Sequence, residues 1–260
     1  MYLEKAKELL DKEYKAKHDI ATGVGRLLIE EKIKHSYQVL GAGNLILKNE
    51  EIYKNLSDDE IDLLKATLLL HDIGRFEEAV FKDVDHGVWG AELLQKTFEF
   101  NKNTVCLAIK HHGHLIEALY EDEEYIRLDD DEKNEIKKYI FLVRDADKIA
   151  NFYLLSNEFE EMEELFFRPA HLKDSCDVSD FVRNEFMNHR SINKRDVKTY
   201  AEQTLMIMAC VFDINYSASF KFLDKLMIMD KLMNMCARFW NNHDSMDFKR
   251  VILEYIKNRI

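Results

Sequence analysis

A histidine and an aspartate stand side by side in the tetrapeptide His71-Asp72-Ile73-Gly74, directly after the apolar run from Ala66 to Leu70. Imidazole and carboxylate groups are both good ligands for a divalent cation. The apolar run carries these polar groups toward the interior, where each of them needs a partner. The alternative is an ordinary helix end, with a solvated aspartate and Gly74 as the stop signal.

Further histidines and aspartates on both sides of this tetrapeptide favour the metal site. They are His35 upstream, and His86, His111, His112, Asp145 and Asp147 downstream. The set mixes nitrogen and oxygen donors and contains no thiolate, so it differs from closed structural zinc sites, which usually take cysteine.

These residues resemble the HD-domain superfamily of metal-dependent phosphohydrolases. The resemblance covers roughly Lys34 to Phe152 and rests on His35, the segment from Leu69 to Arg75, and Ala146-Asp147-Lys148. It implies an HD-domain-like helical bundle that holds a divalent ion (Mn, Fe, Co, Ni, Zn or Mg) through four ligands. Those four ligands are His35, His71, Asp72 and Asp147.

The additional histidines resemble those of the two-metal members of this superfamily. That resemblance implies a second ion held by His86 and His111, with His112 as the third choice and Asp72 bridging both ions. The alternatives are substrate contacts or solvated histidines. Asp145 competes with Asp147, because each has apolar neighbours three and four residues back. The family pattern selects Asp147 and leaves Asp145 as a residue that orients a ligand or as a solvated acid.

The resemblance implies hydrolysis of a nucleotide or another small phosphate ester, because a bound divalent ion activates water and neutralises charge on phosphorus. The expected catalytic residues are Asp72, Arg75 and Lys148, and the two cations would hold the substrate phosphate. Alternatively, Arg75 and Lys148 are ordinary surface cations. Two other classes stay open: a di-iron HD-fold oxygenase, and a non-catalytic nucleotide-binding module. A complete open metal site argues against the second.

Composition sets the broad class of the protein. With 260 residues, 8 glycines and 1 proline, the chain favours long helices with short loops. The formal net charge of −12 repels extended nucleic acid. The four cysteines form no CxxC pair and the first residues carry charges, so we expect a cytoplasmic protein with reduced thiols and no membrane partner.

The expected partner is a small phosphorylated substrate. A homodimer formed through the methionine-rich run 226–235 is the alternative to core filling by those side chains.

Hydrophobic periodicity and capping signals place the candidate ligands on helices. A helix from Arg26 to Lys48 carries His35 on its apolar face, and a capping box at Ser57–Glu60 starts a helix that brings His71 to the buried side of its last turn. Further helices are expected over Val88–Phe98, over Val105–His112 with Thr104 as the cap, and from Asp129 to the Asp145/Asp147 pair.

The expected organisation has three parts. They are an N-terminal helix (1–25), an HD-type metal-binding core (26–155) and a helical C-terminal extension (156–260) that includes helices over Thr199–Phe212 and Ala218–Trp240.

Overall fold

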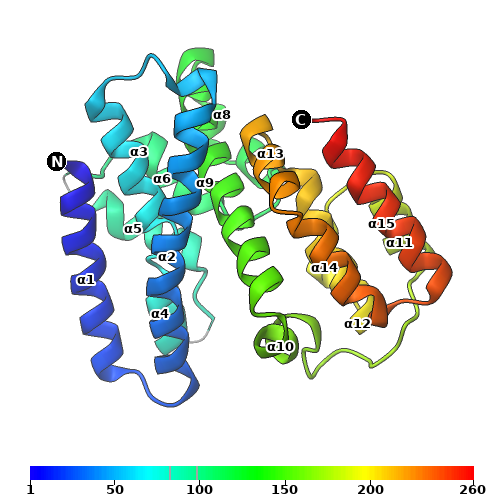
Figure 1. Cartoon of the computed structure of the whole chain (residues 1–260). Coiled ribbons are helices and arrows are strands. Elements are labelled where there is room, and N and C mark those ends of the chain that lie inside the picture. The colour runs from blue at the N-terminus through cyan, green and yellow to red at the C-terminus, as the bar shows by residue number, and fades with distance from the viewer. Residues whose placement is uncertain (82, 98) are drawn as a thin grey trace. The chain divides into compact units, whose positions relative to one another are not determined.

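The computed structural model describes residues 1–81, 83–97 and 99–260, and its regular elements are helices (Figure 1). Lys173 and Thr199 form an isolated β-bridge, but the described residues contain no strand. The all-α prediction is therefore confirmed. Among these residues, no helix has the length and apolar character needed to cross a bilayer.

The chain divides into two compact units, Met1–Asp147 and Lys148–Ile260. The division falls within helix α9 (Asp130–Asn157), and so does the division expected from the sequence at residue 155. The N-terminal helix α1 belongs to the first unit, in which it packs against α3.

The first unit contains the HD-like segment, and its helices pack around α3. Helix α3 lies against α1 and α2, and α5 packs against α6 (Figure 1). The helices are α1 (Tyr2–Ile20), α2 (Val24–Asn49), α3 (Asp58–Leu70), α4 (Arg75–Val80), α5 (His86–Gln95), α6 (Asn103–His111), α7 (Glu117–Tyr120), α8 (Glu123–Ile126) and the first part of α9, with a 3-10 turn at Glu51–Tyr53.

Helix α3 begins as the sequence predicts. The Ser57 hydroxyl accepts the Glu60 backbone N–H at 3.3 Å, and the Glu60 carboxylate accepts the Ser57 backbone N–H at 2.8 Å. This reciprocal pair satisfies two N–H groups that would otherwise lack partners at the helix start. Asp129 and Glu132 form the same reciprocal pair at the start of α9, with distances of 2.9 and 3.1 Å.

Two predicted helix boundaries differ from the structure. Helix α5 begins at His86, because the Asp85 carboxylate caps it by accepting two backbone N–H groups. It ends at Gln95, and Phe98, the predicted end, lies outside the described residues. The prediction of Thr104 as the cap of α6 is wrong, because the helix begins at Asn103 with Lys102 in the cap position.

The second unit has a helical core of its own. Its elements are α10 (Phe159–Met162), a π-helical turn at Glu163–Phe167, α11 (Asp180–Met187), α12 (Tyr200–Ala209), α13 (Ser217–Lys225), α14 (Ile228–Cys236) and α15 (Asn242–Lys257), with 3-10 turns at Lys194–Asp196, Cys210–Asp213 and Ala237–Phe239. Met229 and Met233 are buried in this core, as core filling predicts, whereas Met227 of the same run is exposed.

The expected single helix over Ala218–Trp240 is interrupted between α13 and α14. Met227 adopts a left-handed conformation with φ of 51° and is exposed. A non-glycine residue rarely adopts this conformation. No glycine or proline marks the break, so the sequence pattern does not predict it.

Candidate metal centre

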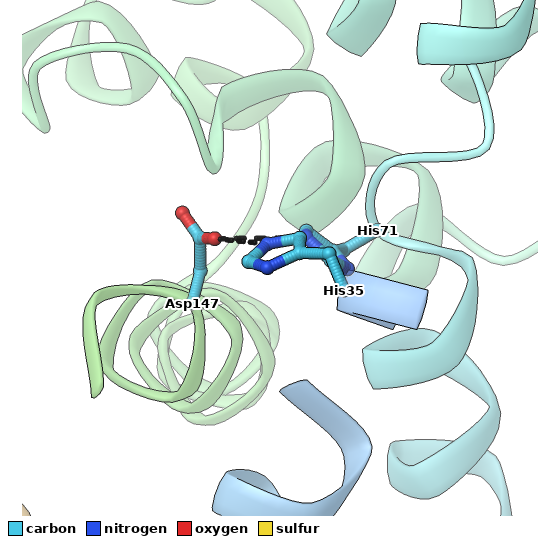
Figure 2. A group of neighbouring side chains, drawn as sticks. All are labelled: His35, His71 and Asp147. Atoms are coloured by element: carbon cyan, nitrogen blue, oxygen red, sulfur yellow. Dashed lines mark hydrogen bonds and ion pairs between the residues drawn. The ribbon is translucent and has the colours of Figure 1, made fainter. Parts of the chain in front are cut away.

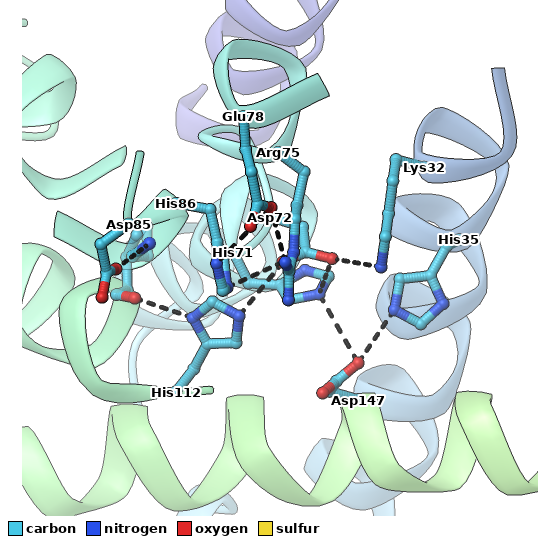
Figure 3. A network of polar contacts seen from close by, with 12 residues as sticks. Lys32, His35, His71, Asp72, Arg75, Glu78, Asp85, His86, His112 and Asp147 are labelled. Carbon is cyan, nitrogen blue, oxygen red and sulfur yellow. Dashed lines mark hydrogen bonds and ion pairs between the residues drawn. The ribbon is translucent and has the colours of Figure 1, made fainter. Parts of the chain in front are cut away.

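Four segments of the first unit bring histidine and aspartate side chains together (Figure 3). Two overlapping groups result, and in each of them the possible ligand atoms lie within 4.8 Å of one another. We call His35, His71 and Asp147 the α9 triad, because α9 supplies its carboxylate. We call His71, Asp72 and His112 the α6 triad, because His112 directly follows α6. His71 belongs to both triads.

The α9 triad joins α2, the turn that follows α3, and α9 through one carboxylate oxygen (Figure 2). Oδ1 of Asp147 lies 2.9 Å from Nε2 of His35 and 3.8 Å from Nε2 of His71. Burial by itself would raise the pKa of Asp147, but the hydrogen bond with His35 and the neighbouring imidazole of His71 outweigh it and hold this pKa below its usual value. Asp147 is therefore a carboxylate with two imidazoles beside it.

The hydrogen bond of His71 fixes which of its ring nitrogens faces the cluster. Nδ1 lies 2.9 Å from the carbonyl oxygen of Leu68, and because a carbonyl only accepts, Nδ1 must carry the proton. Nε2 then holds a lone pair in neutral His71, and it is buried without a hydrogen-bond partner. Burial lowers the pKa of His71 to about 4. A neutral imidazole with an unpartnered Nε2 is the form that binds a metal ion.

His112 is held in the same way. Its Nδ1 donates to the carbonyl oxygen of Ile109 at 2.7 Å, and its Nε2 lies 3.2 Å from Oδ1 of Asp72. Neutral His112 therefore presents a lone pair to a carboxylate oxygen. Such a contact is favourable only when a cation, either a proton or a metal ion, lies between the two acceptors.

Asp72 stands at the centre of the cluster and is 3% exposed. Oδ2 accepts a hydrogen bond from Nζ of Lys32 at 2.8 Å, and Oδ1 lies 3.4 Å from Nε of Arg75. Burial would raise the pKa of Asp72, but the positive charges of Lys32 and Arg75, together with the neighbouring imidazoles of His71 and His112, hold it well below the usual value. The two oxygens of one carboxylate thus face different partners.

Lys32 was not identified in the sequence analysis. It precedes His35 by three residues on α2, so the two side chains share one face of the helix. A basic residue one turn before a candidate ligand is the signal that would have indicated it.

The structure places the two remaining histidine candidates differently. Nε2 of His86 lies 3.6 Å from Oδ1 of Asp72 and is buried without a hydrogen-bond partner; burial lowers its pKa to about 3. His111 turns away, because its Nε2 lies 2.7 Å from Asp122, which also accepts from Lys110 at 2.7 Å. The expected preference for His111 over His112 is therefore reversed in the geometry.

The remaining candidates lie in or near α9 and α4. Asp145 is fully buried, so its interpretation as a solvated acid is wrong, whereas Asp147 lies in the α9 triad as the family pattern predicts. Arg75 contacts Asp72 and also pairs with Glu78 at 2.6 Å. Lys148 lies in the second unit, where its ammonium group pairs with Asp213 at 2.9 Å.

Two glycines allow the main chains around the cluster to touch. Gly74 was expected to end a helix, but α3 ends at Leu70 and Gly74 has an ordinary φ of −71°. A Cβ on Gly74 would lie 2.0 Å from the carbonyl oxygen of His86, and a Cβ on Gly87 would lie 2.5 Å from that of Lys110. The turn 71–74, the start of α5 and the end of α6 therefore pack backbone against backbone.

We expect the Gly74→Ala variant to lose about 1–3 kcal/mol of stability, because a methyl group there must displace main-chain atoms of His86. Urea denaturation followed by circular dichroism measures the change. Gly41→Ala is the matched control, since no atom lies within 4 Å of a Cβ at this position inside α2. Unchanged stability of Gly74→Ala would contradict the assigned close contact.

The cluster fits a divalent cation. It offers imidazole nitrogens and carboxylate oxygens, and the buried Nε2 atoms of His71 and His86 lack hydrogen-bond partners. A first-row divalent ion accepts this mixture of donors.

Comparison with known proteins identifies the segment that carries the cluster. The HD domain family matches residues 33–151, a range that includes both triads and His86. Searches of curated proteins and of solved structures found no match. The geometry of the cluster and the family match agree, and residues 33–151 carry an HD domain, a family that is generally one of metal-dependent phosphohydrolases.

Proposed function

We propose that this protein hydrolyses a nucleotide or another small phosphate ester with the help of one or two divalent ions. The observation that best supports this proposal is the fixed orientation of two imidazole rings. Nδ1 of His71 and Nδ1 of His112 each donate to a backbone carbonyl, so both Nε2 atoms face the Asp72 carboxylate. Lone pairs and carboxylate oxygens that converge in this way need a cation between them.

The residues divide between two metal positions. His35, His71, Asp72 and Asp147 would hold the first ion. His86 and His112 would hold a second ion, with Asp72 bridging, because its Oδ1 faces these two histidines and its Oδ2 faces Lys32 and His71. A bound divalent ion would activate water for attack on phosphorus and neutralise the charge that develops there.

The chain's own cations would bind and orient the phosphate group. Lys32 and Arg75 approach Asp72 from α2 and α4, and their side chains are 31% and 33% exposed, so solvent and substrate reach both. Arg75 offers a planar set of donors, whereas Lys32 offers a compact charge. We leave Lys148 out of this role, because its ammonium group already pairs with Asp213.

Asp72 would keep its negative charge throughout the reaction. The positive groups around it hold its pKa well below the usual value, so protons do not compete for its oxygens near neutral pH. The low pKa of His71, about 4, has the same consequence for its Nε2. Both groups would be available to a metal ion without first losing a proton.

The direct test uses the purified protein and a panel of nucleotides, sugar phosphates and phosphodiesters. Mn²⁺, Co²⁺, Ni²⁺, Mg²⁺ and Fe²⁺ are supplied one at a time, and loss of substrate is followed by chromatography. Metal-dependent loss of a substrate to its hydrolysis products supports the proposal. Absence of hydrolysis with every ion contradicts it, and two tightly bound irons with oxygen uptake would then favour the oxygenase alternative.

A further inference from the structure

Arg144 lies in α9 one turn before Asp147 and is 2% exposed. Its Nη1 lies 3.1 Å from the carbonyl oxygen of His111 and 3.0 Å from that of His112, and it also contacts the carbonyl oxygen of His114. One buried guanidinium therefore holds the carbonyl groups of residues 111, 112 and 114, at the point where α6 ends.

The end of α6 needs such donors. The last carbonyl groups of a helix have no partner within the helix, and burying them unsatisfied is costly. The His112 ring donates to the carbonyl of Ile109, and Arg144 donates to the carbonyls of His111 and His112. A charged donor forms a stronger hydrogen bond than a neutral one.

We propose that Arg144 is a positioning residue that fixes His112 for metal binding. By holding the carbonyl groups of residues 111 and 112, it sets the backbone from which the His112 ring projects toward Asp72. Helix α9 thus acts on the centre twice, through the carboxylate of Asp147 and, one turn earlier, through the guanidinium of Arg144. The inference rests on the metal site of the proposed function.

Metal binding in Arg144→Met tests the inference without any substrate. Methionine keeps an apolar stem and removes every donor. We expect Co²⁺ affinity to fall about tenfold to a hundredfold, the usual range when the group that orients a ligand is removed, with a changed visible absorption spectrum of bound Co²⁺. Arg144→Lys restores charge and donors without the planar geometry, so its affinity should lie between those of wild type and Arg144→Met.

A matched control separates positioning from a general loss of stability. Arg183→Met removes another partly buried guanidinium, which pairs with Asp244 through two contacts of 2.6 and 2.7 Å in the second unit. It should bind Co²⁺ with wild-type affinity and spectrum. Circular dichroism at the titration temperature selects the variants that are folded, and Arg144→Lys carries the test if Arg144→Met is not.

A double-mutant cycle with His112→Ala identifies the residue through which Arg144 acts. If Arg144 acts through His112, Arg144→Met should cause little further loss of Co²⁺ affinity once His112 is absent. Full additivity in this cycle, or wild-type Co²⁺ binding by both Arg144 variants, overturns the inference and leaves the proposed function intact. Failure of the wild-type protein to bind Co²⁺ overturns both.

Discussion

The Asp72→Asn variant is expected to lose divalent-metal binding and hydrolysis together while it remains folded. Asn keeps the shape of the side chain but removes the charge that lies between the imidazoles and the two cations. Removal of a residue that only orients a ligand lowers metal affinity about tenfold to a hundredfold, so loss of a ligand carboxylate should lower it by at least about two orders of magnitude. Because Lys32 and Arg75 are each about one-third exposed, water can solvate them in the variant.

Metal content by mass spectrometry and phosphate release measure the two losses. The control is Asp62→Asn, whose carboxylate accepts backbone N–H groups at the start of α1 and belongs to neither triad. It should keep wild-type metal content and rate. Full metal content and full activity in Asp72→Asn would falsify the assignment of the site.

Without metal, the protein should lose stability steeply as the pH falls from 6.5 toward 4. The ordinary histidine pKa of 6.5 applies to the unfolded chain, but burial lowers the pKa of His71 to about 4 and that of His86 to about 3 in the fold. In this window the unfolded state binds more protons, so acid favours unfolding. Each histidine contributes up to about 1.4 kcal/mol per pH unit once the unfolded imidazole is protonated, or roughly 3 kcal/mol for the pair between pH 6.5 and 5.

The carboxylates do not mask this effect. The pKa values of Asp72 and Asp147 lie below the usual 3.8, so their contribution to stability is lost only at more acidic pH. Urea denaturation at several pH values, with chelator present, gives the slope. His86→Gln should reduce it, whereas His243→Gln, whose side chain is 84% exposed, serves as the surface control. Constant stability between pH 7 and 5 would refute the prediction.

Local signals in the sequence predicted the helices that carry the centre, because those signals act within one helix. The capping box at Ser57–Glu60 and the apolar face of α2 each involve residues a few positions apart, and both occur as expected. Selection of Asp147 over Asp145 needed the family pattern, because apolar spacing treats the two alike. The break at Met227 has no local signal and was missed.

The order of His111 and His112 shows what local signals cannot supply. The two residues are adjacent at a helix end, so about 100° of rotation separates their side chains. The His111 ring contacts the Asp122 carboxylate, whereas the His112 ring contacts the Asp72 carboxylate. Both carboxylates are distant along the chain from the histidines that they contact. The requirement for glycine at position 74 is equally non-local, because it comes from the nearby carbonyl group of His86.

The fixed ring orientations have a consequence for the choice of metal. With His86, they place three imidazole nitrogens around the single carboxylate of Asp72. Ca²⁺ takes oxygen ligands, whereas imidazole suits first-row transition ions. We expect the centre to reject Ca²⁺, and excess Ca²⁺ should fail to displace Co²⁺ in a competition titration. Selectivity would then be a property of the donor atoms.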